Sequence, residues 1–600
     1  MRMRIAFGVL IVVWTVLLTR VYYLSIKTGD YYAQIAEQNV LKTEKIPPIR
    51  GQILDRRGRP LAVNKLGFSV LIKPHIKKQE IIDAEIAALV ECFPDLNATK
   101  LAREYKRNDS PYNQDFVEVI DFIDYDKMLT SFAKLSFREN LEIRPISKRF
   151  YPHNELASHV VGYVGRANLK DVEIDPTAKL TGQMGRSGVE RYYHELLQGE
   201  SGERKTRVTA LNQEIEQVSY KKPSSSDIVL TLDMELQEYL AEAFGDQVGA
   251  AVVMDLRDGA ILAAASFPEY DLNPFVTGIS KTQWEEIMEN PDHPFTNKLV
   301  NSLYPPGSVV KMTMGMAFFA SGKIAPTTRI MCDPYYELGG RKFRNWRDWG
   351  YSNMTIVDAL RESCDTYFYR GAHSVGIDVI TDTLVRFGFG SKTGVDLPNE
   401  YVGVAPGREW KRARLRQPWY QGDTLNTSIG QGNFLVTPMQ VAKNTAYFAS
   451  GLEVTPHFLW KVNGEEVKFE NRDVLTPAEK SQIEYVRKGM YEVANVQGGT
   501  ARRTLEPANV VIGAKTGSAQ VVGISQTDKK RIKEEAMEYY QRSHAWITTY
   551  APFEAPRYVV TVLVEHGAHG GGAGGPVAAK IYNKLIEMGY IEEKYLKKKK

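Results

Sequence analysis

Hydrophobic positions divide the chain into one long apolar segment near its start and shorter patterned runs elsewhere. Ile5–Thr19 is uncharged and apolar, and apolar side chains continue through Ile26. This approaches the roughly 20 residues that a helix needs to cross a bilayer. Arg2 and Arg4 precede it, which favours a cytoplasmic N-terminal end. No small-x-small cleavage site follows, so the pattern predicts an uncleaved anchor. The alternative, a buried core helix, is disfavoured by the position behind two arginines.

Beyond the anchor, the patterns predict two larger regions. At 600 residues the chain is too long for one hydrophobic core, so we expect two or three domains. Residues 50–62 predict two short strands around a charged turn, and residues 76–135 predict mostly helices. Residues 185–199 predict a glycine turn that opens a helix, and the Pro-Ser stretch at 223–226 is the clearest linker.

The region after this linker has strands at both ends and helices between them. The pattern predicts a strand at 227–232, a helix ending at 244, a hairpin of 250–255 and 260–265, a long helical stretch at about 310–450, strands at 509–514, 545–550 and 558–565, and a final helix at 577–589. Strands so far apart in the chain imply one sheet assembled from distant segments, an α/β domain with a helical insertion.

Composition adds little to this picture. The chain is 43% hydrophobic and 25% charged, with a formal net charge of +4, so nothing indicates nucleic-acid binding. The basic tail Lys597–Lys600 carries no functional prediction of its own. The three cysteines do not suggest a disulfide framework, and their odd number leaves at least one free thiol.

One serine has the setting of a nucleophile. Ser308 and Lys311 form a Ser-x-x-Lys motif that follows a Pro-Pro-Gly turn and opens an apolar run, which predicts a buried helix. On a helix the two side chains share one face. A serine hydroxyl needs a base to take its proton, and a buried lysine with a lowered pKa can be that base. The same spacing starts at Ser131 and Ser219, in a mixed polar region and a linker.

Two further clusters follow in order along the chain. The Ser-Cys-Asp cluster 363–365 lies in a helical region, and the Lys-Thr-Gly-Ser cluster 515–518 directly follows a β-branched run. A strand-borne Lys-Thr-Gly can hold an extended peptide at a sheet edge, because it supplies a charge, a hydroxyl for a carboxylate and a glycine for close approach. A second Lys-Thr-Gly begins at Lys392, but it follows a glycine loop, so we discard it.

These three motifs, in this order, resemble the signature of the penicillin-recognising serine acyltransferases. Segments 50–62 and 185–190 resemble pedestal motifs of the class B penicillin-binding proteins. Asp365, where asparagine is commoner, and the stretch 542–552 are similar to the elongation branch, penicillin-binding protein 2. The resemblance to this family extends over nearly the whole chain. Two further stretches resemble a transpeptidase-domain motif: 428–432 and 436–440.

The resemblance implies a fold and a domain plan. The fold would be the α/β (α+β) penicillin-recognising serine transpeptidase fold, an antiparallel sheet with a helical insertion, after an N-terminal α+β pedestal and one transmembrane helix. The implied domains are a cytoplasmic tip with the anchor (1–26), a dimerisation-type pedestal (27–225), the transpeptidase domain (226–592) and a basic tail (593–600).

The resemblance also implies acyl transfer without a cofactor. The nucleophile would attack the D-Ala-D-Ala amide of a peptidoglycan stem peptide, and an amine of a second strand would resolve the acyl-enzyme into a crosslink, whereas β-lactams stop at the acyl step. Backbone N–H groups of the first serine and of the residue after Lys-Thr-Gly would form the oxyanion hole. The implied catalytic residues are Ser308 (nucleophile), Lys311 (base), Ser363 (proton relay), Asp365 (orientation) and Lys515, and the implied substrate-binding residues are Thr516, Gly517 and Ser518.

The cysteines near the second motif raise the question of a metal. Cys332, Asp333 and Cys364 could contribute ligands, but no histidine lies between Asp333 and Ser363, so we expect no metal. Because the neighbours of Cys364 are committed to the site, we expect it to be a free thiol.

The implied role is crosslinking during cell elongation and rod-shape maintenance, with a possible carboxypeptidase side activity. The catalytic domain would lie outside the inner membrane, on its periplasmic side, and the implied partners are stem peptides, β-lactams, a SEDS-family membrane glycosyltransferase and the elongation complex. The alternatives are a β-lactam-hydrolysing or β-lactam-sensing protein, a mainly structural activator of a glycosyltransferase, and an inactive scaffold. A pedestal of about two hundred residues and the lack of a polytopic sensor region disfavour a β-lactam-hydrolysing or β-lactam-sensing protein.

The pedestal motifs also predict ion pairs. Charged residues beside glycine turns are costly to bury unless they pair. We therefore expect Asp55 and Glu190 to pair with arginines such as Arg50, Arg56 or Arg149.

Overall fold

The computed structural model describes residues 2–28, 41–112, 115–208, 214–347, 352–523 and 534–598. The last two residues of the basic tail lie outside them. The chain forms two compact units, each made of several segments. The first comprises Met1–Gly51, Ala167–Gln183 and Gln198–Ser226, and the second comprises Gln52–Arg166, Met184–Leu197 and Asp227–Lys600.

The first unit contains the apolar helix and a small sheet. α1 (Arg2–Tyr22) continues into a π-helical turn, and the segment Ile5–Lys27 is long and apolar enough to cross a membrane. The predicted N-terminal helix is thus confirmed. The sheet is antiparallel with the strand order β1-β8-β9. Besides α1, the described part of this unit contains the strands β1 (Leu41–Ile46), β8 (Gly202–Val208) and β9 (Glu214–Lys221) and the short helices α8 (Leu169–Ile174) and α9 (Ala178–Thr181).

A long strand organises the N-terminal part of the second unit. β3 (Pro60–Ile72) pairs antiparallel with both β4 (Val117–Asp124) and β5 (Leu141–Phe150). α3 (Gln79–Cys92) and α4 (Ala98–Asn108) share an apolar core with these strands. The prediction of mostly helices at 76–135 is therefore wrong where β4 forms, because its side chains fill that core. Further elements here are α5 (Tyr125–Leu129), α6 (Phe132–Ser136), α7 (Ser158–Val161), β6 (Val164–Arg166), β7 (Gln183–Gly185), α10 (Gly188–Tyr192) and α11 (His194–Gln198).

The same sheet continues into strands from later in the chain. β2 pairs with β3, as the pattern at 50–62 predicts, and β10 joins them in parallel to β2. The remaining strands of this seven-stranded sheet are β2 (Ile53–Leu54), β10 (Ile228–Leu230), β17 (Leu459–Val462) and β18 (Glu465–Glu466).

One of the two predicted ion pairs of this region is confirmed. Arg149 Nε lies 2.6 Å from Glu190 Oε1, and both side chains are fully buried. The Tyr151 hydroxyl donates to the same carboxylate oxygen at 3.2 Å. A buried carboxylate with a cation and a hydroxyl donor is compensated for the loss of water.

The other acid has a different partner from those expected. Asp55 pairs with Arg59, whose Nε lies 2.9 Å from Oδ2, and not with Arg50 or Arg56. The backbone N–H groups of Arg57 and Arg59 donate to Oδ1 at 2.8 and 2.7 Å. Asp55 and Arg59 face each other across this tight turn, since the backbone N–H of Asp55 donates to Arg59 O, and this places the Arg59 side chain beside the carboxylate.

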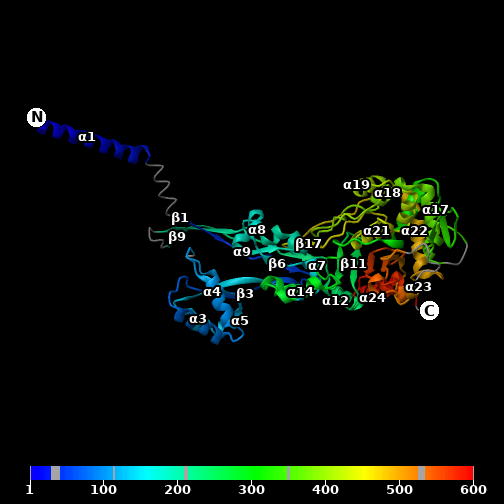
Figure 1. The fold of residues 1–600 in the computed structure, drawn as a ribbon, viewed down its shortest axis with the longest axis horizontal. Coiled ribbons are helices and arrows are strands. Elements are labelled where there is room, and N and C mark those ends of the chain that lie inside the picture. The colour runs from blue at the N-terminus through cyan, green and yellow to red at the C-terminus, as the bar shows by residue number, and fades with distance from the viewer. Residues whose placement is uncertain are drawn as a thin grey trace. The chain divides into compact units, whose positions relative to one another are not determined.

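A five-stranded antiparallel sheet lies at the centre of the C-terminal part, in the order β12-β11-β21-β20-β19. Its strands are β11 (Gly249–Asp255), β12 (Ile261–Phe267), β19 (Gly513–Ala519), β20 (His544–Ala551) and β21 (Tyr558–Val564). β11, green in Figure 1, pairs along its whole length with the C-terminal strand β21. The predicted sheet of distant segments is confirmed. β19 starts later than the predicted strand 509–514, so the Lys-Thr-Gly motif lies within the strand.

Helices cover both faces of this sheet. Along β11, Ala250 and Val252 face one apolar core while Ala251 and Val253 face another, as the two-residue period of a strand requires. α12 (Met234–Phe244) and α24 (Gly570–Glu587) belong to the second core, and α15 (Lys311–Ala320) and α21 (Pro438–Ser450) to the first.

The helical insertion predicted between the hairpin and the later strands is present, and besides β17 and β18 its described residues contain further short strands. Its other helices are α13 (Asn273–Thr277), α14 (Lys281–Glu289), α16 (Ile356–Glu362), α17 (Asp365–Val375), α18 (Ile377–Arg386), α19 (Arg408–Leu415), α20 (Gln421–Ser428), α22 (Pro477–Asn495) and α23 (Arg502–Leu505). The short strands are β13 (Ile330–Cys332), β14 (Tyr335–Leu338), β15 (Arg341–Arg344) and β16 (Ser352–Met354).

Candidate active site

The first motif forms a tight turn that leads into a buried helix. Ser308 lies in the 3-10 turn Gly307–Val310, and Lys311 is the first residue of α15. Gly307 has a φ of +55°, and a Cβ on it would lie 2.7 Å from the carbonyl oxygen of Ser518. Only glycine fits this position, so the turn is held directly against β19. The Ser308 side chain is partly exposed, whereas Lys311 is fully buried.

Lys311 is bound by the second motif. Its Nζ donates to Asp365 Oδ1 at 2.6 Å, to Ser363 O at 2.9 Å and to Ser363 Oγ at 3.3 Å. Burial lowers the pKa of Lys311, because a charged ammonium loses its hydration, and the Asp365 carboxylate opposes that shift. A lysine with a lowered pKa beside a serine turn is suited to accept a proton.

Two short helices present the second motif. Ser363 ends α16 with a φ of +54°, and Asp365 begins α17. A left-handed conformation is uncommon for a residue other than glycine and is kept only where neighbouring contacts impose it. It directs Ser363 Oγ and the Asp365 carboxylate to the same ammonium group.

The third motif brings a second buried ammonium group. Lys515 Nζ donates to Ser363 Oγ at 3.1 Å and to Thr516 O at 2.9 Å. Burial sets the pKa of Lys515 well below its ordinary value, the nearby charge of Lys311 lowers it further, and Asp365 opposes both. Ser363 Oγ therefore lies between two lysines with lowered pKa values, an arrangement suited to passing protons.

The remaining residues of the third motif lie on the same strand, β19. Thr516 Oγ1 lies 2.7 Å from Thr500 Oγ1, and Ser518 O accepts from Gln431 Nε2 at 3.2 Å. A Cβ on Gly517 would lie 3.0 Å from Pro306 O, so the strand approaches the serine turn closely at this position. β19 is the last strand in the order of its sheet.

The discarded motifs lie in other environments. Lys392 is exposed, and the following Thr393 is bound through N–H and hydroxyl to Glu400, so this Lys-Thr-Gly closes a loop. Ser131 is the N-terminal cap residue of α6, and Ser219 lies on the exposed strand β9.

The expectation for Cys364 is wrong. Cys364 forms a disulfide with Cys332, and Cys92 is the free cysteine. β13 places Cys332 beside the start of α17, although 32 positions separate the two cysteines in the chain. Both sulfurs are thus committed to each other. Within the described ranges, no group of three or more His, Cys, Asp or Glu residues is arranged to hold a metal ion.

Sequence reasoning also missed two residues that contact the second motif. Asn345 Oδ1 accepts from the backbone N–H of Asp365 at 2.9 Å, and the backbone N–H of Trp346 donates to Asp365 Oδ2 at 3.0 Å. Both follow the β14–β15 hairpin, and no motif marks them. The one available signal was Cys364 at the N-terminal cap of a helix, where a cysteine is unusual.

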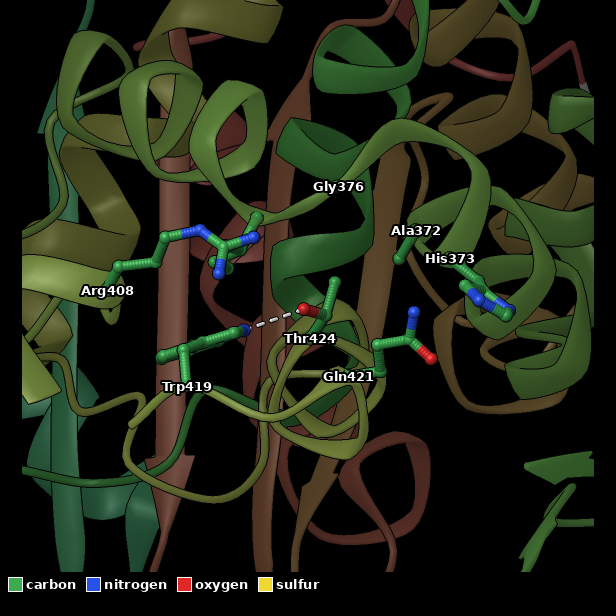
Figure 2. Close-up of a pocket in the computed structure, with 8 residues that line it drawn as sticks. Ala372, His373, Gly376, Arg408, Trp419, Gln421 and Thr424 are labelled. Atoms are coloured by element: carbon green, nitrogen blue, oxygen red, sulfur yellow. Dashed lines mark hydrogen bonds between the residues drawn. The ribbon is translucent and has the colours of Figure 1, made fainter. Parts of the chain in front are cut away.

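A small cavity lies apart from the three motifs. It has a volume of about 120 Å³ and is shown in Figure 2. The Trp419 indole N–H donates to Thr424 Oγ1 at 2.8 Å, and Arg408 pairs with Asp378. The residues around this cavity supply no nucleophile–base pair, so we assign the chemistry to the motif cluster.

Comparison with known proteins agrees with this cluster. The model of the penicillin-binding protein transpeptidase domain matches residues 249–587, and that of the penicillin-binding protein dimerisation domain matches 45–230. The peptidoglycan D,D-transpeptidase MrdA of Haemophilus influenzae is 33% identical over 605 residues, covering 98% of this chain and 92% of that protein. MrdA of Escherichia coli K12 is 32% identical over 593 residues, covering 96% and 92%.

Solved structures give the same result. PBP2 of Helicobacter pylori, in a complex with MreC, has 41% identity and a TM-score of 0.84, covering 92% of this chain and 99% of that one. A structure titled as the structural coordination of polymerization and crosslinking by a peptidoglycan synthase complex has 27% identity and a TM-score of 0.71, covering 99% of each chain.

Fold and site together define a class, the penicillin-binding transpeptidases, which transfer an acyl group through a serine. Within that class the chain belongs to the MrdA (PBP2) family of peptidoglycan D,D-transpeptidases. Its reaction is the crosslinking of peptidoglycan, and it is a target of penicillins.

Proposed function

We propose that Ser308 is the nucleophile of this transpeptidase and Lys311 its base. Ser308 Oγ attacks the carbonyl of the D-Ala-D-Ala amide, and its proton passes to Lys311. The C–N bond then breaks, and the proton reaches the leaving D-alanine through Ser363. The observation that carries this proposal is the buried contact of Lys311 Nζ with Ser363 Oγ and Asp365, directly behind the serine turn.

The third motif then recognises the donor peptide. Lys515 and the Thr516 hydroxyl attract the terminal carboxylate, and Gly517 lets the peptide backbone approach the strand. Backbone N–H groups of Ser308 and Ser518 stabilise the oxyanion, a contribution of roughly 3–4 kcal/mol per donor. An acceptor amine attacks the acyl-enzyme in the second half-reaction, which forms the crosslink and returns a proton to Ser308.

The test is covalent labelling of the full-length protein with a fluorescent penicillin. Ser308→Ala is expected to abolish the label, while Ser131→Ala and Ser219→Ala keep it, because only Ser308 precedes a buried lysine. Mass spectrometry should place the adduct on the peptide that holds Ser308. An adduct on any other peptide would exclude the mechanism.

The measured lifetime of the adduct separates the remaining functions. Deacylation over hours supports a transpeptidase, whereas fast turnover would support a β-lactam-hydrolysing protein.

Residues 1–26 form the cytoplasmic tip and the membrane anchor, 27–225 the pedestal, 226–592 the transpeptidase domain and 593–600 the basic tail. The apolar helix follows Arg2 and Arg4, which supports a cytoplasmic N-terminal end. The catalytic domain then lies on the periplasmic side of the inner membrane.

The protein acts in cell elongation as one component of a multiprotein complex. Its relatives carry the name MrdA, and solved relatives are titled as a complex with MreC and as part of a peptidoglycan synthase complex that coordinates polymerization with crosslinking. These titles support a polymerising partner for this chain, and we propose that it is a SEDS-family glycosyltransferase. Activation of that partner is a second function compatible with catalysis.

A further inference from the structure

The second motif is bound by residues outside all three motifs. The Cys332–Cys364 disulfide fixes the residue between Ser363 and Asp365 to the end of β13. One residue further along, the backbone N–H of Asp333 donates to Thr366 Oγ1 at 3.0 Å, and that hydroxyl donates to Asp333 O at 2.8 Å. A covalent bond and two hydrogen bonds therefore join β13 to the first turn of α17.

Asn345 continues this connection to the carboxylate itself. Its Oδ1 accepts from the backbone N–H of Asp365, and its Nδ2 donates to Cys332 Sγ at 3.5 Å. Its own backbone N–H donates to Pro334 O at 2.8 Å, which fixes it to the segment directly after β13, the strand that bears Cys332. The next N–H in the chain, that of Trp346, binds Asp365 Oδ2 and leaves Oδ1 to Lys311.

We propose that Asn345 and the Cys332–Cys364 disulfide are positioning residues for acyl transfer, which hold Asp365 against Lys311. Neither touches the reacting atoms. Both act on a loop that contains the left-handed Ser363, a conformation that needs support from its surroundings. The inference rests on the roles proposed above for Ser308 and Lys311.

A positioning role has a signature that general destabilisation lacks. Among the described residues, the charged groups that face Lys311 are Asp365 from α17 and Lys515 from β19. Asp365 favours the charged form of Lys311, so loosening it lowers the pKa of Lys311 further. Because Lys311 must be neutral to take the proton, the rising limb of the acylation rate against pH then moves to lower pH.

The experiment measures the acylation rate by a fluorescent penicillin from pH 5 to 9, on the full-length protein in detergent. The variants are Asn345→Ala and Cys332→Ser, and Asn353→Ala is the matched control because its side chain is exposed on β16. For both variants we expect the maximal acylation rate to be at least tenfold slower and the rising limb of the pH–rate profile to shift down by about one pH unit. The Asn353→Ala control should match the unsubstituted protein in both respects.

Two results would overturn the inference. One is an unchanged rate in Asn345→Ala. The other is a slower rate with an unmoved limb, in proportion to a lowered melting temperature, which would mean that these residues only stabilise the fold. If Cys332→Ser does not fold, Asn345→Ala alone decides. Ser308→Ala is labelled in parallel: label on that variant would refute the proposed function itself, whereas its absence confines any failure to the positioning role.

Discussion

At the scale of single residues, the site places two ammonium groups on one hydroxyl, Ser363 Oγ, at 3.3 Å from Lys311 and 3.1 Å from Lys515. Both lysines are buried, and among the residues that the structure describes one carboxylate, that of Asp365, faces them. Burial lowers the pKa of both lysines, because a charged ammonium loses its hydration, and the charge of Lys311 lowers the pKa of Lys515 further. Lowered pKa values suit these lysines to accept and pass on a proton.

A carboxyl group outside the site, that of Glu269, also has a shifted pKa. Glu269, between β12 and α13, has one oxygen that is buried without a hydrogen-bond partner among the described residues. Burial raises the pKa of Glu269 to about 8, and backbone N–H groups of Ala157 and Ser158 offset only part of this shift. The folded protein therefore keeps a proton on Glu269 that the unfolded chain releases above its ordinary pKa.

This yields a stability prediction with a definite sign. Because the folded pKa is raised, the stabilising contribution is complete below pH 4.5 and is lost as pH rises through about 8. Glu269→Gln, which stays neutral, should stabilise the protein by roughly 3 kcal/mol at pH 7 and by nothing near pH 4. Melting temperatures of both proteins across this range test it, with Glu285→Gln on the exposed face of α14 as the control. Equal stabilisation at every pH would contradict the assignment.

At the scale of elements, the chemistry of Lys-Thr-Gly depends on the element that carries it. Lys515 lies on β19 and reaches Ser363, whereas Lys392 lies in a loop and is exposed. Lys515→Ala removes a charge from a buried network and should slow acylation by roughly a hundredfold. Lys392→Ala should leave the rate within about twofold, since exposed substitutions have small effects. The measurement is the second-order rate of penicillin labelling, and equal slowing of the two variants would show that the wrong strand was chosen.

The sequence indicated the anchor helix, the hairpin and the distant strands of the central sheet, because each has a local periodicity. It misplaced the start of α24, which begins at Gly570 within a glycine-rich stretch of low helix propensity. A Cβ on Gly574 would lie 2.7 Å from Ile547 Cγ2, so close packing on β20 overrides that propensity. It missed the disulfide and Asn345 because their proximity to Asp365 arises from the folding of β13 to β16, which no local pattern reports.

At the scale of the whole molecule, the buried pair Arg149–Glu190 and the turn at Asp55 concern a region without catalytic residues. We expect these pairs to fix a shape that the proposed polymerising partner would recognise. Asp55→Ala or Glu190→Ala, in protein that still folds, should leave penicillin labelling of Ser308 nearly unchanged and weaken glycan polymerisation several-fold. Removing one partner of a buried pair costs roughly 3–5 kcal/mol, and Asp55→Ala also removes the acceptor of the backbone N–H groups of Arg57, Arg59 and Met234, so the melting temperature of each variant is measured first.

The assay is a reconstituted pair of this protein and the glycosyltransferase proposed above as its partner. Labelling and consumption of the lipid-linked precursor are scored separately, and Arg144→Ala, which removes an exposed pair on β5, serves as the control. A parallel fall of both activities with thermal stability would reduce the region to a support and end the partner-activation hypothesis.

The Cys332–Cys364 bond also bears on when the enzyme becomes competent. Disulfides persist where thiols are oxidised, and the cytosol keeps them reduced. A chain whose second motif is completed by such a bond therefore leaves the ribosome with an unfinished site. In the orientation proposed above, crossing the membrane would supply the missing bond, and the transpeptidase would mature in the compartment that holds its substrate, while a copy retained in the cytosol would stay immature.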